Sequence, residues 1–246
     1  MERGWEVIRL ANWRLPGPPP PDARPVAVYA EPLFAEAVAD QTGRILLEPP
    51  PGWLPSLPRE FLLRAVGLDT LDGLRAHAAP RFVKPAEGKV FEPRVYPGGS
   101  ELPPPDQVDG SLPVLWSDPV HFELEVRCFV QGGEILALSP YWRNGALAQD
   151  SGGDWPFEST EEQEATDFIH AVLKQLANNI PPAFVLDVGR IQDRGWAVIE
   201  GNPCWGAGLY GCPAGAALDT GLSTLVPRGA MTPDLWKWTS PRVQAG

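Results

Sequence analysis

Cysteine and lysine are scarce in this sequence of 246 residues, and it has no long apolar run. Its 3 cysteines (Cys128, Cys204 and Cys212) are too few and too scattered for a disulfide framework or a zinc ribbon, which favours a reducing compartment. No stretch approaches the roughly 18 apolar residues that cross a membrane, and residues 1–15 lack the apolar core of a signal peptide. We therefore expect a cytoplasmic protein with no membrane partner.

The sequence has 20 basic and 31 acidic side chains, which leave a formal net charge of -11. This balance disfavours a long surface that follows a phosphate backbone, so we exclude nucleic acid as the main partner. A small anionic ligand stays compatible with the charge, because a pocket needs only a few local cations. With 43% apolar residues, the chain has enough material for the core of one large domain or of two small interlocked ones.

The 30 prolines punctuate the sequence, with clusters at 16–21, 49–51 and 103–105 that indicate stiff loops. Apolar periodicity before the third cluster predicts short elements of both kinds. They are a strand at 25–30, a helix at 32–41, a strand at 44–47, helices near 58–66 and 68–77, and a strand at 81–84. The first three indicate a small α/β unit.

From residue 113 onward the sequence has the pattern of strands, interrupted by one amphipathic helix. This helix is predicted to begin near Ser159 or Thr160 and to end before Pro181. Strands are predicted at 113–117, 121–130, 134–139, 183–188 and 196–200. The short Gly-containing turn between the second and third of them suggests an antiparallel meander.

Two patterns resemble known site motifs, but the sequence around them argues against that chemistry. Gly206–Gly211 fits G-x-G-x-x-G, yet too few residues follow it for half of a dinucleotide-binding fold. His121 and Glu123, together with Cys204, are similar to part of the zinc-deaminase signature, but Ala207 stands where a second cysteine is needed. We therefore expect structural roles for these residue patterns.

Three oxygen donors stand at the ends of two predicted strands. Asp187 ends an apolar run, and Glu200 and Asn202, two residues apart, project from one face of the next strand. Magnesium takes a few carboxylate or amide oxygens from a protein and completes its shell with water and phosphates, so this set suits metal–nucleotide chemistry. Polar strand ends that face solvent are the alternative that the pattern leaves open.

Two of the four lysines lie in one short stretch, where Lys84 ends a strand and Lys89 follows a glycine-containing loop. Two ammonium groups at this spacing can flank one polyphosphate. Further on, Glu123, Glu125 and Arg127 alternate along one strand, and we expect them to share a face. There a carboxylate can hold a ribose hydroxyl and the guanidinium can reach a transferring phosphoryl group. A cross-strand ladder of salt bridges is the alternative.

The order of these motifs resembles the ATP-grasp superfamily. The matching segments are Phe82-Val83-Lys84-Pro85, Val114 to Asp118, Glu125 to Val130, Leu186-Asp187 and Val198 to Pro203. Lys89, the Glu-x-Arg-x-Phe strand, Ser139-Pro-Tyr141 and the segment Trp205 to Gly211 are similar to a small clade named for an arginine and two lysines. The match covers roughly residues 81–225. Larger members carry another phosphate-binding lysine before the central one; no lysine precedes Lys84 here, and the resemblance implies that Lys89 replaces it.

The resemblance implies an α+β fold in which two α+β lobes hold ATP between antiparallel sheets. A short α/β pre-grasp region is expected at 1–79, the ATP-grasp domain at 80–226 and a tail rich in proline and tryptophan at 227–246. Lys84 is expected to contact the α- and β-phosphates, Lys89 another phosphate, and Glu125 or Glu123 the ribose. The adenine is expected against a hinge made of Leu115, Trp116, Ser117 and Asp118.

The implied reaction needs ATP and Mg2+. Asp187, Glu200 and Asn202 are expected to bind two magnesium ions, and Arg127 is expected to act catalytically on the γ-phosphoryl group, together with Lys89. A substrate carboxylate would attack the γ-phosphate to give an acylphosphate, which an amine or thiol captures. Arg143 and Arg190 are candidates for holding that carboxylate.

Two other functions stay open at this stage. One is an ATP-binding module without independent catalysis, which the short N-terminal region favours, and the other is a small-molecule kinase. The expected partners are a small-molecule or peptide carboxylate and an amine, and the sequence identifies neither. The oligomeric state is equally open, with a homodimer as one option.

Overall fold

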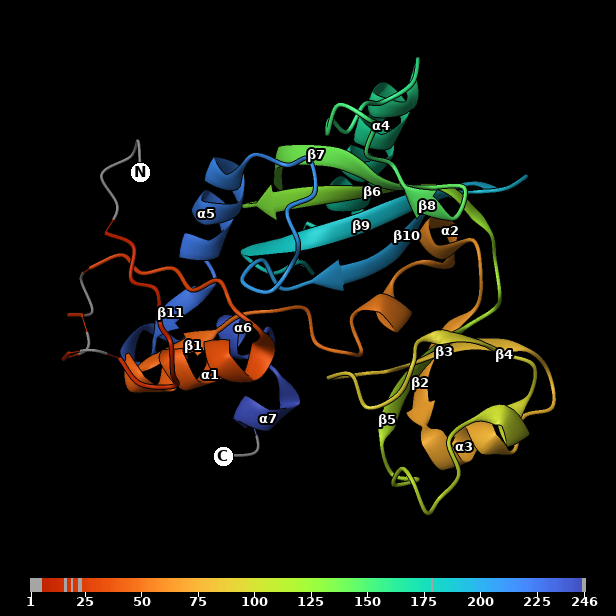
Figure 1. Ribbon diagram of the computed structural model, residues 1–246, viewed down its shortest axis with the longest axis horizontal. Coiled ribbons are helices and arrows are strands. Elements are labelled where there is room, and N and C mark those ends of the chain that lie inside the picture. Colours follow the sequence, from red (N-terminus) through yellow and green to blue (C-terminus); the bar gives the residue numbers. More distant parts are fainter. Residues whose placement is uncertain (1–5, 16, 19, 22–23, 178, 245–246) are drawn as a thin grey trace.

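The computed structural model describes residues 6–15, 17–18, 20–21, 24–177 and 179–244. These residues form two antiparallel sheets and a smaller third body, which lie next to one another (Figure 1). Helices and antiparallel sheets are mixed along the chain, so the predicted α+β class is confirmed.

The larger sheet has five strands in the order β10-β9-β6-β7-β8. Their bounds are β6 (Phe122–Gln131), β7 (Glu134–Arg143), β8 (Ala146–Leu147), β9 (Ala183–Ile191) and β10 (Gly195–Asn202). Helix α4 (Glu161–Gln175) lies over one face of this sheet, and α5 (Ala214–Leu222) lies near one end of it (Figure 1). Ala165, Ile169 and Val172 of α4 pack with buried side chains of β6 and β9 and form the main core.

The smaller sheet has four strands in the order β2-β5-β3-β4 and is the second large body of the molecule. Its strands are β2 (Val66–Thr70), β3 (Arg81–Pro85), β4 (Arg94–Tyr96) and β5 (Pro113–Ser117). The short helices near it are η1 (Leu54–Ser56), α2 (Arg59–Leu62), α3 (Leu71–Arg75) and η2 (Gly99–Glu101). Leu71 and Leu74 of α3 pack on Val83 and Val114, which gives this lobe a core of its own.

The third body joins both ends of the described chain. Strand β1 (Arg44–Leu46) pairs with β11 (Leu225–Pro227), and α1 (Pro32–Gln41) packs on them. The helices η3 (Arg228–Ala230), α6 (Pro233–Trp236) and α7 (Pro241–Gln244) follow β11.

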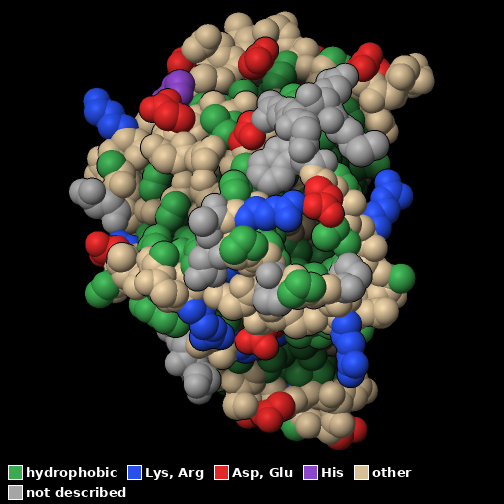
Figure 2. Space-filling model, turned by 90° about the vertical axis from the view of Figure 1, so that its left-hand side faces the viewer, with side chains coloured by type: hydrophobic (Ala, Val, Ile, Leu, Met, Phe, Trp, Pro, Cys, Tyr) green, Lys and Arg blue, Asp and Glu red, His purple; other side chains and the backbone are tan. Residues whose placement is uncertain are grey.

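On the face of the molecule that Figure 2 presents, acidic, basic and hydrophobic side chains are interspersed. Within the described ranges, no helix combines the length and the apolar character that a membrane crossing requires.

Two of the expected elements are wrong. Residues 25–30 form no strand: they pack against Trp205, the Ala30 amide donates to the Trp205 carbonyl and the Tyr29 hydroxyl donates to the Ala207 carbonyl, with no ladder. The helix expected at 68–77 begins only at Leu71, since β2 occupies the residues before it and pairs with β5. Gly67 allows this pairing: a Cβ there would lie 2.6 Å from the Trp116 ring. Tertiary pairing thus overrides the local helical pattern.

A core substitution tests the packing of α4 on the sheet. Ile169→Ala should lower the free energy of unfolding by about 2–5 kcal/mol, because it removes a fully buried side chain and leaves a cavity. Urea denaturation measures the change. Leu136→Ala in β7 is the control, since Leu136 is 40% exposed and should have a much smaller effect. Equal effects of the two substitutions would contradict the assigned core.

Candidate functional site

The cross-strand register of the larger sheet brings the predicted metal ligands together. Arg127 of β6 is the direct partner of Asp187 of β9, and Asp187 is the partner of Glu200 of β10. Direct partners in neighbouring strands project from the same face, so the three side chains form a row across the sheet. This row lies on the face opposite α4, because the residues next to it in β6 and β9, such as Val126 and Val188, belong to the core under that helix.

A β-bulge in β10 sets the direction of Glu200. Val198 pairs with Val188 and is buried in the core against α4, but the register shifts before Glu200, which pairs with Asp187. Ile199 is the extra residue. With regular alternation, Glu200 would project on the same side as Val198, into the apolar core. The bulge therefore turns Glu200 toward Asp187, and the spacing of the sequence alone does not reveal it.

Five side chains make one connected set, which we call the carboxylate network: Lys84, Arg127, Asp187, Glu200 and Asn202. Arg127 donates from Nε to Asp187 Oδ1 at 2.9 Å and from Nη2 to Oδ2 at 2.7 Å. The Asn202 amide donates to Asp187 Oδ2 at 2.9 Å and to Glu200 Oε1 at 2.8 Å. Lys84 of the smaller sheet forms an ion pair with Glu200. The network thus spans both lobes.

The two carboxylates of the network have different environments. Asp187 is fully buried, and this burial raises its pKa to about 6 although Arg127 and Asn202 donate to it. Burial also acts to raise the pKa of Glu200, but the charge of Lys84 and the bonds from Asn202 and Lys84 outweigh it and lower that pKa to about 2. Glu200 is therefore ionised at neutral pH.

Aromatic side chains hold Arg127 in place. Its guanidinium lies 5.3 Å from the ring centroid of Tyr141 and 4.9 Å from that of Tyr210, and these two rings stack on each other at 5.0 Å. Arg127 also donates to the Gly208 carbonyl at 2.9 Å, and the Tyr141 hydroxyl donates to Glu125. The loop between β10 and α5 is therefore tied down over the network.

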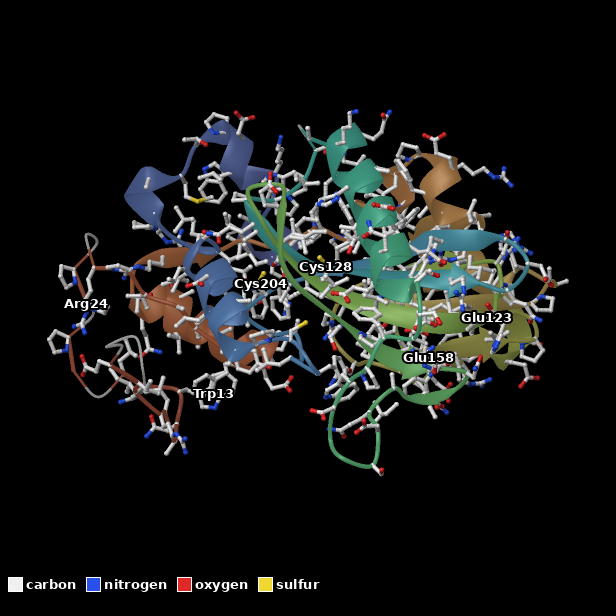
Figure 3. The ribbon with its side chains drawn as sticks, turned by 90° about the horizontal axis from the view of Figure 1, so that it is seen from above. Trp13, Arg24, Glu123, Cys128, Glu158 and Cys204 are labelled. Atoms are coloured by element: carbon white, nitrogen blue, oxygen red, sulfur yellow. The ribbon has the colours of Figure 1, made fainter. Side chains whose placement is uncertain are left out.

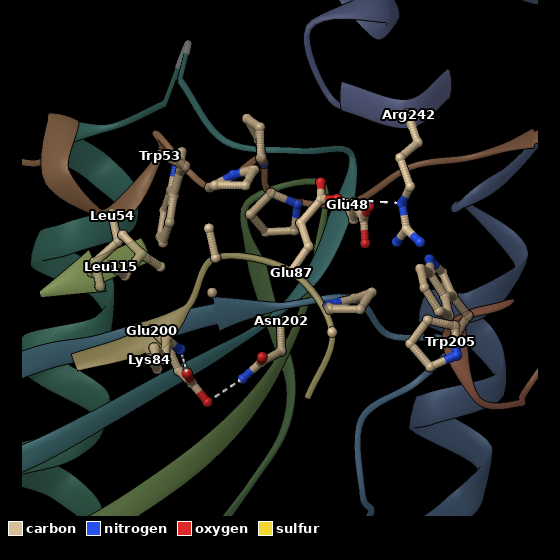
Figure 4. A pocket seen from close by; sticks show the side chains of 18 residues that line it. Glu48, Trp53, Leu54, Lys84, Glu87, Leu115, Glu200, Asn202, Trp205 and Arg242 are labelled. Atoms are coloured by element: carbon tan, nitrogen blue, oxygen red, sulfur yellow. Dashed lines mark hydrogen bonds and ion pairs between the residues drawn. The ribbon is translucent and has the colours of Figure 1, made fainter. Parts of the chain in front are cut away.

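A pocket opens beside the network (Figure 4). Lys84, Glu200 and Asn202 line one end of it, and Glu48, Glu87 and Arg242 line the other. Trp53 forms part of the wall and packs directly on the backbone of β10, where a Cβ at Gly201 would lie 2.7 Å from its ring. One end of the pocket thus presents Lys84 beside a carboxylate and an amide, and the other end is rich in carboxylates.

Arg242 of α7 closes the far end of the pocket. It contacts Glu36 of α1 at 3.0 Å and Glu87, in the loop after β3, at 3.2 Å. Glu48 lies near this group. Burial first, and then the charges of Glu87 and Glu36, raise the pKa of Glu48 to about 7, while Arg242 acts to lower it.

The other residues predicted to bind the nucleotide differ in whether they line the pocket. Leu115 lines the pocket, whereas Lys89 is exposed in the loop after β3 and is not among the lining residues. Arg81 stacks over Trp116 at 4.8 Å and pairs with Asp118, which also accepts a bond from the Ala65 amide at 2.9 Å. The predicted hinge segment, including the buried Ser117, is therefore the end of β5 and the residue after it.

The structure separates Glu123, Arg143 and Arg190 from the network. Arg143 and Arg190 are the cross-strand partners of Leu124, which is buried against α4, so they project toward α4. Arg143 is bonded to Glu161 at 2.7 Å, and Arg190 contacts Glu161 at 3.7 Å and Glu123 at 3.3 Å. Figure 3 shows Glu123 at the end of the molecule where this group lies.

The expectation that Glu123 shares a face with Glu125 and Arg127 is wrong. The register of β6 against β9 shifts between Phe122 and Leu124, and this irregularity places Glu123 beside Arg190. Glu125 stays on the network face, where burial raises its pKa. Alternation along β6 alone does not reveal this shift, because the shift belongs to the pairing of β6 with β9.

The oxygen donors of the network fit a hard divalent cation. Asp187 and Glu200 supply carboxylates, and rotation of the Asn202 amide would turn Oδ1 toward the place where Nδ2 now lies between them. Throughout the portion of the chain that the structure describes, no three His, Cys, Asp or Glu side chains gather as a metal site. The candidate set therefore depends on the amide of Asn202 as its third donor.

A sequence model of the ATP-grasp domain matches residues 61–220, and it describes family 2 of the clade named for one arginine and two lysines. The chain belongs to this family. The match includes the whole carboxylate network and both large sheets, so the resemblance inferred from the motifs is confirmed. No curated protein matches the sequence.

Several solved structures are similar to this ATP-grasp chain. The D-cycloserine synthetase DcsG is 14% identical with a TM-score of 0.46, over 72% of this chain and 69% of that one. D-Alanine–D-alanine ligase from Bacillus anthracis is 15% identical with a TM-score of 0.40, over 65% and 62%. C-terminally truncated Cdc123 from Schizosaccharomyces pombe is 27% identical with a TM-score of 0.28, over 39% and 35%. The last two matches span less than two thirds of the relatives' own length, and with such low TM-scores the family assignment rests on the sequence model.

Motifs in the sequence did not indicate three residues that line the pocket of the candidate site: Glu48, Trp53 and Arg242. Glu48 and Trp53 flank the proline cluster at 49–51, which the sequence marked only as a loop. Arg242 belongs to a tail without clear periodicity. Only the packing of α7 and of this loop against the sheets brings these residues to the site.

The raised pKa of Glu48 predicts a pH-dependent gain in stability when its charge is removed. The folded protein favours the protonated carboxyl, so this contribution is fully present below the ordinary pKa of 4.5 and is lost as the pH rises through about 7. Glu48→Gln should therefore raise the free energy of unfolding by about 2 kcal/mol at pH 8 and by much less at pH 5.

Urea unfolding of both proteins across this pH range measures the difference. Glu134→Gln, at an exposed position of β7, is the matched control and should show no comparable trend. A stability difference for Glu48→Gln that does not grow with pH would contradict the prediction, because it would show that the surroundings of Glu48 do not disfavour its charged form.

Proposed function

We propose that this ATP-grasp chain binds ATP with Mg2+ and activates a carboxylate as an acylphosphate, which an amine or thiol captures. One observation carries the proposal: the two lobes bring Lys84, Glu200 and Asn202 together at one end of a pocket, and Asn202 also donates to the buried Asp187. Oxygen donors beside a lysine are the combination that a metal–polyphosphate needs.

The residues of the chain would divide the work as follows. Lys84, from β3, would contact the α- and β-phosphates, and Arg127 would stabilise charge on the γ-phosphoryl group. Asp187, Glu200 and Asn202 would hold the magnesium ions, which supply charge neutralisation on the phosphates when bound. Lys89 is exposed in the loop after β3, so its proposed contact with a phosphate requires that loop to turn inward.

The proposed reaction has two transfers. A substrate carboxylate oxygen attacks the γ-phosphorus, the bond from that phosphorus to the β,γ-bridging oxygen breaks, and ADP leaves. An amine or thiol then attacks the acyl carbon, the bond from this carbon to the phosphate oxygen breaks, inorganic phosphate leaves, and the nucleophile loses its proton. The protein contributes positioning and charge, because neither step needs a covalent bond to a side chain.

The ends of the pocket suggest where the substrates would lie. The network occupies one end, so the nucleotide phosphates are proposed there, while Glu48, Glu87 and Arg242 at the other end would face the acid and the nucleophile. Arg143 and Arg190, which we proposed from the sequence for the substrate carboxylate, instead bond to Glu161 on the α4 side. Arg242, by contrast, lines the pocket, so we propose it for that role in their place.

Substitution of a metal ligand tests the proposed activity. Glu200→Gln and Asn202→Ala should each lower ATP turnover by about 100-fold or more, because the metal loses a donor. Release of ADP and phosphate is measured over a panel of carboxylates, each with and without an amine or thiol. Asp193→Asn, in the exposed turn between β9 and β10, is the control and should keep full activity, since asparagine tolerates its positive φ of 60°.

The other outcomes identify the alternatives. Full turnover in Glu200→Gln would refute the proposal. ATP binding by calorimetry without turnover on any substrate pair would identify a binding module, and a stable phosphorylated product in mass spectrometry would identify a kinase.

A further inference from the structure

Arg64 is a buried cation that reaches from one lobe to the other. It lies between α2 and β2, is 6% exposed, and directs its guanidinium to the edge strand β10 of the larger sheet. Nη1 donates to the Val198 carbonyl at 2.8 Å, and Nη2 donates to the Ile199 carbonyl at 3.2 Å. One arginine thus binds two consecutive peptide groups of β10.

These two peptide groups form the β-bulge that turns Glu200 toward Asp187. The register shifts between Val198 and Glu200, so Ile199 has no partner in β9. A bulge disrupts the ladder locally, and carbonyls buried there need another donor. Because β10 is an edge strand, a donor from outside the sheet can reach these carbonyls, and Arg64 supplies it.

The position of Arg64 is itself fixed on several sides. Nη1 also donates to the Leu62 carbonyl at 3.0 Å, and the guanidinium lies 5.3 Å from the ring centroid of Phe122. The neighbouring Ala65 amide donates to Asp118 at the end of β5. The segment that carries Arg64 is therefore held by the smaller sheet while its side chain holds the larger one.

The charge of Arg64 is also part of the site. Burial lowers its pKa to about 10, while the negative charges of Glu200, Asp118 and Glu125 act to raise it. It therefore stays charged at neutral pH. A lysine would keep this charge, but its single ammonium group lacks the planar fork that binds two carbonyls at once.

We propose that Arg64 is a positioning residue for the metal ligand Glu200, which it acts on by fixing the bulge of β10. The inference rests on the proposed function, because it assumes that Glu200 binds metal. Loss of a group that hydrogen-bonds to a metal ligand typically weakens metal affinity by about 10- to 100-fold. Arg64 binds the backbone next to Glu200 and not the carboxylate itself. We therefore expect its loss to weaken metal affinity by a factor near the lower end of this range.

Metal binding by the full chain tests this role directly. Arg64→Lys should raise the dissociation constant for Mn2+, measured by electron paramagnetic resonance with a non-hydrolysable ATP analogue, by about 10-fold. Arg75→Lys is the matched control, because Arg75 in the same lobe also donates to carbonyls, those of Pro103 at 3.0 Å and Val108 at 2.9 Å, away from β10. It should leave the Mn2+ affinity unchanged even where it lowers the melting temperature equally.

Two further variants distinguish a loss of Glu200 positioning from a general loss of stability. In a Glu200→Gln background, Arg64→Lys should weaken Mn2+ binding no further, because the ligand that it positions is already lost. Phe122→Leu removes the ring beside the guanidinium but keeps Arg64, and should raise the dissociation constant by a smaller factor, about 3-fold. This milder variant keeps the test decisive if Arg64→Lys fails to fold.

The outcomes are distinguishable. Wild-type affinity for Mn2+ in both Arg64→Lys and Phe122→Leu would overturn the positioning role and leave the proposed function standing. An equal loss in Arg75→Lys, or a full additional loss in the Glu200→Gln background, would overturn it as well. Failure of the wild-type protein to bind Mn2+ with the nucleotide analogue would instead overturn the proposed function itself.

Discussion

Two carboxylates on neighbouring strands, the fully buried Asp187 and the partly buried Glu200, have to be kept close together. Like charges repel and each loses hydration on burial, so the arrangement requires compensation nearby. Arg127 supplies it to Asp187 as a two-point ion pair, Lys84 supplies it to Glu200, and the Asn202 amide bridges the two. Much of the surrounding structure serves to hold these three groups.

The compensation also explains how the lobes meet. Lys84 belongs to the smaller sheet and Glu200 to the larger one, so their ion pair is an interlobe contact. Arg64 adds bonds from the smaller lobe to the β10 backbone just before Glu200. A change in the relative position of the lobes would therefore disturb the contacts that hold Glu200, which couples the packing of the lobes to the proposed metal site.

Local signals in the sequence identified most of the network. The sequence shows Asp187 at the end of an apolar run, Glu200 and Asn202 at a spacing of two, and Lys84 at a strand end. Alternation along a strand predicts which of these side chains share a face. The same periodicity failed for Glu123, where a register shift intervenes, and for the start of the helix expected at 68–77, where β2 pairs with β5 and the helix begins only at Leu71. Both errors come from contacts with residues far away in the chain.

The sequence by itself determined the chemistry of this protein's site: which oxygen donors and cations are present, in which order, and on which strands. Tertiary structure decided which of them meet. The bulge at Ile199 turns Glu200 to the network face, the register shift in β6 sends Glu123 to Arg190, and the packing of α7 brings Arg242 to the pocket. The physical reason is that side-chain type is a property of single residues, whereas register and interlobe contacts depend on hydrogen bonds and packing between segments distant in sequence.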